Sequence, residues 1–208
     1  MKPNQITIFG GTFNPFHNGH LEIVKNIHDK LNIENIILLP NKTTYYKKCL
    51  EIVSDDDRIA MLKAVAEDTD FLSVSDIEIR RGGVTHTIDT VRSIYSNFPE
   101  SKVSFIIGGD SLLHLPEWVD SYELFDRVHF ITVIRGNIDT DKSVYLIKKY
   151  KENYSASIDL FSMPFIDISS SMIRDKIKNG ESIDELVPDK VRDYIEAKGL
   201  YRGEKYNR

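Results

Sequence analysis

Residues 10–20, GGTFNPFHNGH, follow the short apolar run of residues 6–9, ITIF, and lead into a segment with helical periodicity. The residues that recur at helical spacing are Leu21, Val24, Ile27 and Leu31. Open parallel sheets bind phosphates at the loop between the end of a strand and the start of the next helix, and here that loop begins with a glycine pair. Gly10 and Gly11 let the backbone approach a ligand closely, with amide hydrogens directed at anionic oxygens. The stretch therefore predicts a strand, a phosphate-binding loop and a helix in an α/β fold.

His17 and His20 are the distinctive residues of this stretch, because they lie one helical turn apart and their side chains can point the same way. Two imidazoles at a phosphate site can donate hydrogen bonds to oxygens that gain charge during transfer at phosphorus. The residues alone leave two alternatives: one histidine caps the helix while the other packs or lies at the surface, or the pair binds zinc. Zinc is disfavoured because the other four histidines are scattered and the chain has one cysteine. The stretch is neither a P-loop nor the GxGxxG dinucleotide fingerprint.

Short apolar runs alternate with helix-period segments along the rest of the chain, which is the pattern of a parallel sheet covered by helices. Further strands are predicted over residues 36–39, 71–75, 103–107, 128–134 and 158–161. Helices are predicted to begin near Asp55, Thr87, Ser169 and Pro188, and the first of them has Ile59, Leu62 and Val65 as its predicted buried stripe. Residues 41–54 and 136–143 are expected to be surface loops. We expect an α/β, Rossmann-like doubly wound parallel sheet with helices on both faces, in a single domain of residues 1–208.

The composition of the 208 residues is that of a globular domain. A hydrophobic fraction of 41% supports a core, and a net charge of -5 disfavours a dedicated nucleic-acid binder. Cys49 is the single cysteine, which excludes an internal disulfide and fits a reducing compartment. No apolar run reaches the length needed to cross a bilayer, and the first residues lack the layout of a signal peptide. We expect a cytoplasmic protein that binds neither nucleic acid nor membrane.

A second candidate anion site lies toward the other end of the sequence, in residues 168–174, ISSSMIR. Hydroxyl groups and backbone amides at a helix N-terminus bind anions. Arg174 follows one turn later, where its planar guanidinium can bond phosphate oxygens. Three serines before a helix are, taken alone, more often a simple N-cap. The anion-site interpretation gains weight because the first motif accompanies them.

Both motifs resemble those of the HxGH nucleotidyltransferase superfamily, GGTFDPxHxGH and ISSTxIR, with Asn14 in place of the commoner aspartate and Ser171 in place of threonine. We expect the first change to be tolerated, because a short polar side chain still serves the turn. The resemblance implies in-line attack by a substrate phosphate on the α-phosphorus of ATP. Phosphoryl chemistry generally needs Mg²⁺, and we expect the ion to arrive with ATP because the sequence shows no dedicated carboxylate cage. The catalytic residues would be His17, His20 and Arg174. The ATP-binding residues would be Gly10, Gly11, Thr12, Phe13, His17, His20, Lys47, Gly108, Asp110, Arg135, Ser170, Ser171 and Arg174. The resemblance also implies that the C-terminal part, about residues 165–208, is a helical subregion that completes the ATP site.

Three further segments resemble the bacterial nicotinate mononucleotide adenylyltransferases of this superfamily: residues 76–90, residues 105–112 with Trp118, and residues 187–201. The resemblance implies that nicotinate mononucleotide is the acceptor, with Trp118 stacked on the pyridine ring and Asp110 on ribose hydroxyls. The acceptor-binding residues would be Asn14, Thr85, His86, Thr87, Asp110, Leu112 and Trp118. His86 replaces the tyrosine usual in this segment. Residues 44–47, TYYK, replace the family's PPHK or PPHR, so Lys47 keeps the basic charge there.

Other interpretations remain open from the sequence. The same chemistry could act on nicotinamide mononucleotide or pantetheine phosphate, although the pantetheine enzymes are shorter and lack the Trp118 segment. A nucleotide-binding module without turnover would be expected to lack His17, His20 or Arg174, and all three are present. Three positions also have structural alternatives: Asp110 as a helix cap, Trp118 as a core residue and Arg135 as a solvated surface residue. The sequence also leaves open whether the chain forms a homo-oligomer.

Overall fold

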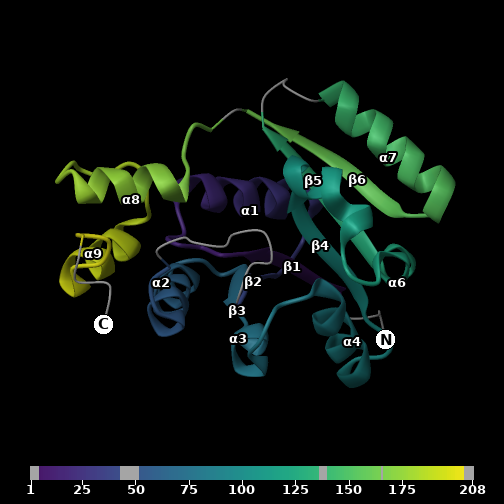
Figure 1. Cartoon of the computed structure of the whole chain (residues 1–208), viewed down its shortest axis with the longest axis horizontal. Helices are drawn as coiled ribbons and strands as arrows, with labels where there is room; N and C mark the ends of the chain where they lie inside the picture. Colours follow the sequence, from purple (N-terminus) through teal and green to yellow (C-terminus); the bar gives the residue numbers. More distant parts are fainter. Residues whose placement is uncertain (1–4, 43–51, 136–139, 165, 204–208) are drawn as a thin grey trace. The chain divides into compact units, whose positions relative to one another are not determined.

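The computed structural model describes residues 5–42, 52–135, 140–164 and 166–203, and within them six parallel strands form one sheet (Figure 1). The strand order is β3-β2-β1-β4-β5-β6. The strands are β1 (Gln5–Gly11), β2 (Ile36–Pro40), β3 (Leu72–Val74), β4 (Lys102–Gly108), β5 (Val128–Arg135) and β6 (Ser157–Met163). A 3-2-1-4-5-6 order with flanking helices is that of a Rossmann-like α/β fold, so the predicted fold class is confirmed.

The chain divides into two compact units. The first comprises Met1–Gly10 and Thr85–Ile166, and the second comprises Gly11–Val84 and Asp167–Arg208. The phosphate-loop motif (residues 10–20) and the serine-arginine motif (residues 168–174) therefore both belong to the second unit, apart from Gly10. That residues 1–208 form a single domain stays a prediction.

In the first unit, β4, β5 and β6 pair in parallel, with Phe105 opposite Phe130 and Phe130 opposite Ile158. Residues 103–107 of β4 are all buried, as in a strand that is covered on both faces. The helices of this unit are α4 (Thr87–Asn97), α5 (Gly109–His114), α6 (Ser121–Arg127) and α7 (Thr140–Tyr154), with the 3₁₀ helix η1 (Leu115–Glu117). The helix α4 begins at Thr87, as predicted.

The start of α7 corrects the prediction that residues 136–143 form a surface connection. The helix begins at Thr140, and residues 136–139 lie outside the described residues. Ser143, Ile147 and Tyr150 are buried at spacings of four and three, which place them on one helical face. The polar first turn hid this periodicity in the sequence.

In the second unit, β2 pairs in parallel with β3, and α2 packs against β3 and α9. The helices of this unit are α1 (Asn18–Leu31), α2 (Asp55–Glu67), α3 (Ile77–Arg81), α8 (Ser170–Lys178) and α9 (Asp189–Lys198). The caps agree with the predicted helix ends, because Ser169 caps α8 and Pro188 precedes the first residue of α9. Gly180, just after α8, has a φ of 73°, a left-handed conformation that favours glycine.

The buried stripe of α2 differs from the predicted one. Leu62 and Val65 are buried as predicted, but Ile59 is only half-buried. Met61 and the charged residue Arg58 are buried in its place. No helix in the described part of the chain is long and apolar enough to cross a membrane.

Candidate active site

His17 and His20 form a reciprocal cap at the start of α1. The backbone N–H of His20 donates to Nδ1 of His17 over 3.3 Å, and the N–H of His17 donates to Nδ1 of His20 over the same distance. The two rings stack with centroids 3.6 Å apart and an interplanar angle of 23°. The two side chains therefore lie together, as their spacing predicted. They also cap the helix, which was one of the alternatives that the sequence allowed.

The cap determines which ring nitrogen carries the proton. Because Nδ1 of each ring accepts a backbone hydrogen bond, the neutral imidazoles of His17 and His20 carry their proton on Nε2. Capping and hydrogen bonding to phosphate thus use different atoms of the same ring, so the two roles are compatible. His17 is buried and His20 half-buried.

Two phenylalanines of the loop pack against His20. The ring centroids of Phe13 and Phe16 lie 5.2 and 5.3 Å from that of His20. A Cβ added at Gly11 would lie 2.9 Å from ring atoms of Phe13, so only glycine leaves this ring its place. Gly11 therefore serves the packing of the loop, and the approach of a ligand to the glycine pair stays a prediction.

The C-terminal motif holds the same loop. Nη1 of Arg174 donates to the carbonyl oxygen of Asn14 over 2.8 Å, and the hydroxyl of Ser170 donates to the carbonyl oxygen of Pro15 over 2.9 Å. Asn18, the first residue of α1, donates its backbone N–H to Leu186 O and its side-chain amide to Glu185 O, each over 2.9 Å. The structure thus brings together the two motifs that the sequence analysis singled out at opposite ends of the chain.

The three serines at the start of α8 divide their roles. The Ser169 hydroxyl accepts from the backbone N–H of Met172 over 3.2 Å and is the N-cap, whereas the Ser170 hydroxyl reaches the loop. Ser171 is exposed, and its hydroxyl lies 3.1 Å from that of Ser169. Arg174 is buried, with 8% of its surface exposed. Ser169 is therefore a simple N-cap, which was the structural alternative for this motif. The phosphate contacts of Ser170, Ser171 and Arg174 stay predictions.

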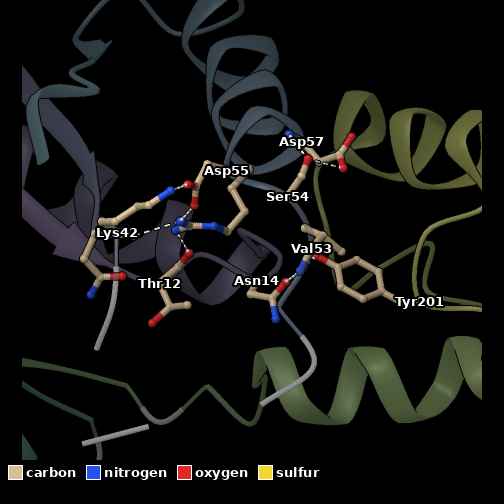
Figure 2. Close-up of polar contacts among 10 residues, drawn as sticks. Thr12, Asn14, Lys42, Val53, Ser54, Asp55, Asp57 and Tyr201 are labelled. Carbon is tan, nitrogen blue, oxygen red and sulfur yellow. Dashed lines mark hydrogen bonds and ion pairs between the residues drawn. The ribbon is translucent and has the colours of Figure 1, made fainter. Parts of the chain in front are cut away.

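A buried arginine that the sequence analysis missed fastens the glycine end of the loop. Arg58 of α2 is 1% exposed and donates to Thr12 O over 2.9 Å and to Asn41 O over 2.8 Å. Its guanidinium also pairs with Asp55 over 2.5 Å, and Asp55 pairs with Lys42 as well (Figure 2). The only hint in the sequence is the i, i+3 spacing of Asp55 and Arg58 at the start of a helix.

The charge on Asp55 follows from this network. Burial alone would raise the pKa of Asp55, but the hydrogen bonds from Lys42 and Arg58 and the two positive charges outweigh it. The net result is a pKa below the ordinary value of an aspartate. Asp55 is therefore an anion at neutral pH that compensates the buried charge of Arg58.

All but one of the remaining predicted site residues belong to the first unit, the exception being Lys47. Gly108 is the exposed N-cap of α5, and Asp110 is exposed in the first turn of that helix, at the carboxyl end of β4 as predicted. Trp118 is half-buried, with its ring centroid 6.5 Å from that of Phe130, and Leu112 is fully buried. Residues 85–87 are half-buried at the start of α4. Their roles toward ATP and the acceptor stay predictions.

Two predicted residues cannot be placed by their side chains. Arg135 is the last residue of β5, where its backbone lies opposite Met163. Lys47 lies outside the described residues, as do the other residues of the divergent segment 44–47. Among the residues that are described, no group of three His, Cys, Asp or Glu side chains could hold a metal ion.

Known proteins share both the sequence and the fold. Residues 8–176 match the cytidylyltransferase-like family. A protein of Lachnoclostridium phytofermentans named "Probable nicotinate-nucleotide adenylyltransferase" is 36% identical over 197 residues, which cover 95% of this chain and 98% of that protein. A Streptococcus pyogenes serotype M1 protein of the same name is 35% identical, over 95% of this chain and 89% of that protein. The chain belongs to the nicotinate-nucleotide adenylyltransferase family.

A solved structure shares the family fold. The Plasmodium falciparum nicotinic acid mononucleotide adenylyltransferase, complexed with NaAD, gives a TM-score of 0.79 at 21% identity, covering 97% of this chain and 98% of that one. The cytidylyltransferase-like match takes in both loop motifs, residues 10–20 and 168–174. The resemblance drawn from those motifs and from the middle of the chain is thereby confirmed.

Proposed function

We propose that this chain transfers the AMP part of ATP to nicotinate mononucleotide, giving nicotinate adenine dinucleotide and pyrophosphate. It is a nucleotidyltransferase of NAD biosynthesis. Full-length relatives at about 35% identity are named "Probable nicotinate-nucleotide adenylyltransferase". In this chain, the observation that supports the chemistry is the stacked pair His17 and His20. Their reciprocal cap fixes two Nε2 donors at the start of a helix, which is a site for phosphate.

The reaction needs no covalent intermediate with the enzyme. An oxygen of the acceptor's phosphate attacks the α-phosphorus of ATP, the bond from that phosphorus to the bridging oxygen of the β-phosphate breaks, and pyrophosphate leaves. Negative charge grows on the oxygens around the α-phosphorus during this step. The Nε2–H groups of His17 and His20 stabilise it, because donors fixed in advance need no reorganisation during the reaction.

The serine-arginine motif supports the ATP phosphates from α8. A guanidinium has five N–H donors, so Arg174 can hold Asn14 O through Nη1 and still present others to a phosphate oxygen. Ser170, Ser171 and the first backbone amides of α8 add the helix N-terminus to this group. Mg²⁺ arriving with ATP would neutralise charge on the leaving pyrophosphate. The helical subregion of about residues 165–208 thus completes the ATP site.

The acceptor is recognised by residues of the first unit. The half-exposed ring of Trp118 stacks on the pyridine, the exposed carboxylate of Asp110 accepts from ribose hydroxyls, and the backbone of residues 85–87 binds the pyridine carboxylate. The single cysteine supports a cytoplasmic location. The net charge of -5 supports small nucleotides rather than nucleic acid as partners.

A panel of acceptors tests this function. The purified chain is supplied with ATP, Mg²⁺ and one acceptor: nicotinate mononucleotide, nicotinamide mononucleotide or pantetheine phosphate. Pyrophosphate release is followed while chromatography identifies the product. We expect strong turnover with the nicotinate substrate. Turnover with another acceptor alone would retain the phosphate chemistry and refute the acceptor assignment, and silence with all three would refute both.

A further inference from the structure

Tyr201 is held in an unusual conformation at the end of the described chain. The helix α9 ends at Lys198, and Gly199 turns the chain with a left-handed φ of 62°, while the N–H of Leu200 returns to Ile195 O. Tyr201 itself has a φ of 66°, which is uncommon for a residue with a side chain. Its ring is nonetheless buried, with 3% exposed. A strained residue of this kind persists only where its surroundings determine it, and such residues concentrate at functional sites.

The Tyr201 hydroxyl forms a hydrogen bond with the phosphate loop. It donates to Oδ1 of Asn14 over 2.9 Å, across 187 positions of sequence (Figure 2). Oδ1 also accepts from the backbone N–H of Val53 over 3.3 Å. Asn14 is 3% exposed, so these bonds form where water does not compete, and a buried polar atom that loses a partner is costly.

Asn14 is therefore fixed from three sides. Arg174 binds its carbonyl oxygen, while Tyr201 and Val53 bind its side-chain oxygen. His17 follows three positions later, and its ring and that of His20 are the predicted donors to the α-phosphate. Only Pro15 and Phe16 separate Asn14 from His17, and Ser170 fastens Pro15. We therefore expect a displacement of Asn14 to reach both rings.

We propose that Tyr201 is a positioning residue of the reaction, acting through Asn14 on the loop that presents His17 and His20. The inference rests on the proposed function, since it concerns the loop of that same site. The Tyr201 ring fills space in the core, and its hydroxyl adds a separate role, which is to set the position of the loop. The two roles can be separated because phenylalanine keeps the ring and removes the hydroxyl alone.

The chain offers a matched control in the same segment. Tyr194 of α9 also donates its hydroxyl to a side-chain oxygen, Oδ1 of Asp57, over 3.0 Å. Asp57 belongs to α2 and not to the phosphate loop. Tyr194→Phe therefore removes a tyrosine hydroxyl bond, half-buried rather than buried, without touching Asn14, and it is expected to leave kcat unchanged.

The test compares wild type, Tyr201→Phe and Tyr194→Phe in steady-state kinetics with ATP and nicotinate mononucleotide, with Tm measured for each. Tyr201→Phe is expected to lower kcat about tenfold, near the upper end of what one neutral hydrogen bond contributes, with a smaller change in KM for the acceptor. Its Tm is expected to fall more than that of the control, because the lost bond is buried, while the chain stays folded at the assay temperature. A wild-type kcat, or a loss of activity that only follows a loss of folded protein, would overturn the proposal.

A double-mutant cycle with Asn14→Asp shows whether the hydroxyl acts through residue 14. A carboxylate accepts a hydrogen bond about twice as strong, so Tyr201→Phe is expected to lower kcat by a larger factor in that background. Equal factors in both backgrounds would overturn the proposal while wild type stays active. Silence of the wild-type chain with every acceptor would instead refute the proposed function, and this inference with it.

Discussion

Replacing Arg58 with methionine is expected to be among the most destabilising single changes in the second unit. The guanidinium is 1% exposed and makes three hydrogen bonds, to the carbonyl oxygens of Thr12 and Asn41 and to the carboxylate of Asp55. Methionine fills a similar length but cannot donate to the two carbonyl oxygens. It also leaves the Asp55 carboxylate with only one of its two cationic partners, Lys42. Breaking a buried pair from one side costs about 3–5 kcal/mol. That is a large share of the roughly 5–15 kcal/mol that holds a domain folded.

Urea unfolding followed by circular dichroism measures this loss, with Arg92→Met as the control. Arg92 also pairs with two carboxylates, Asp120 and Glu123, but 47% of its side chain is exposed. Solvent screens such pairs, so the control is expected to lose far less stability. An Arg58→Met chain as stable as the control would refute the account of Arg58 as a buried clamp. Where the variant is folded, its KM for ATP is expected to rise, because the Thr12 carbonyl belongs to the phosphate loop.

Three further predictions concern charge, acceptor recognition and chemistry. Asp55 has a lowered pKa when folded, so its contribution to stability is present above the unfolded pKa, near pH 4, and is lost as the pH falls through the folded pKa. The difference in unfolding free energy between wild type and Asp55→Asn should therefore be constant near neutral pH and shrink below about pH 4, and a difference unchanged down to pH 2 would contradict this. Trp118→Ala is expected to raise KM for nicotinate mononucleotide about 2- to 13-fold, the range of an aromatic contact of about 0.5–1.5 kcal/mol, and an unchanged KM would remove Trp118 from the acceptor site. His20→Ala is expected to lower turnover by about two to three orders of magnitude, since one fixed donor contributes roughly 2.7–4 kcal/mol to the barrier.

The elements around the phosphate loop could be predicted because their signals are local. A glycine pair after the apolar run of residues 6–9, and helix-period residues after His20, are readable within thirty positions of sequence. The buried β4 and the caps of α8 and α9 were predicted for the same reason, since each depends on neighbouring residues alone. Their confirmation agrees with the general rule that long apolar strands and caps are strong local signals.

The contacts that complete the loop could not be predicted, because their partners are far apart in sequence. Arg58 reads as a surface residue at a helix start, and its burial depends on carbonyl oxygens supplied by Thr12 and Asn41. The predicted stripe residue Ile59 gave way to it for this reason. The bond from Tyr201 to Asn14 joins two ends of the chain, and neither residue alone indicates the other. The start of α7 was missed for a different reason, since its first turn is polar and its buried face appears only from Ser143 onward.

Formation of the dinucleotide by wild type and His20→Ala, measured side by side, tests the central claim most directly. Both purified chains receive ATP, Mg²⁺ and nicotinate mononucleotide, and the amounts of pyrophosphate and dinucleotide are followed while circular dichroism checks the fold. The account predicts equal amounts of both products from wild type, and a rate two to three orders of magnitude lower from a folded His20→Ala chain. A silent wild type, or a His20→Ala chain that turns over at the wild-type rate, would contradict it.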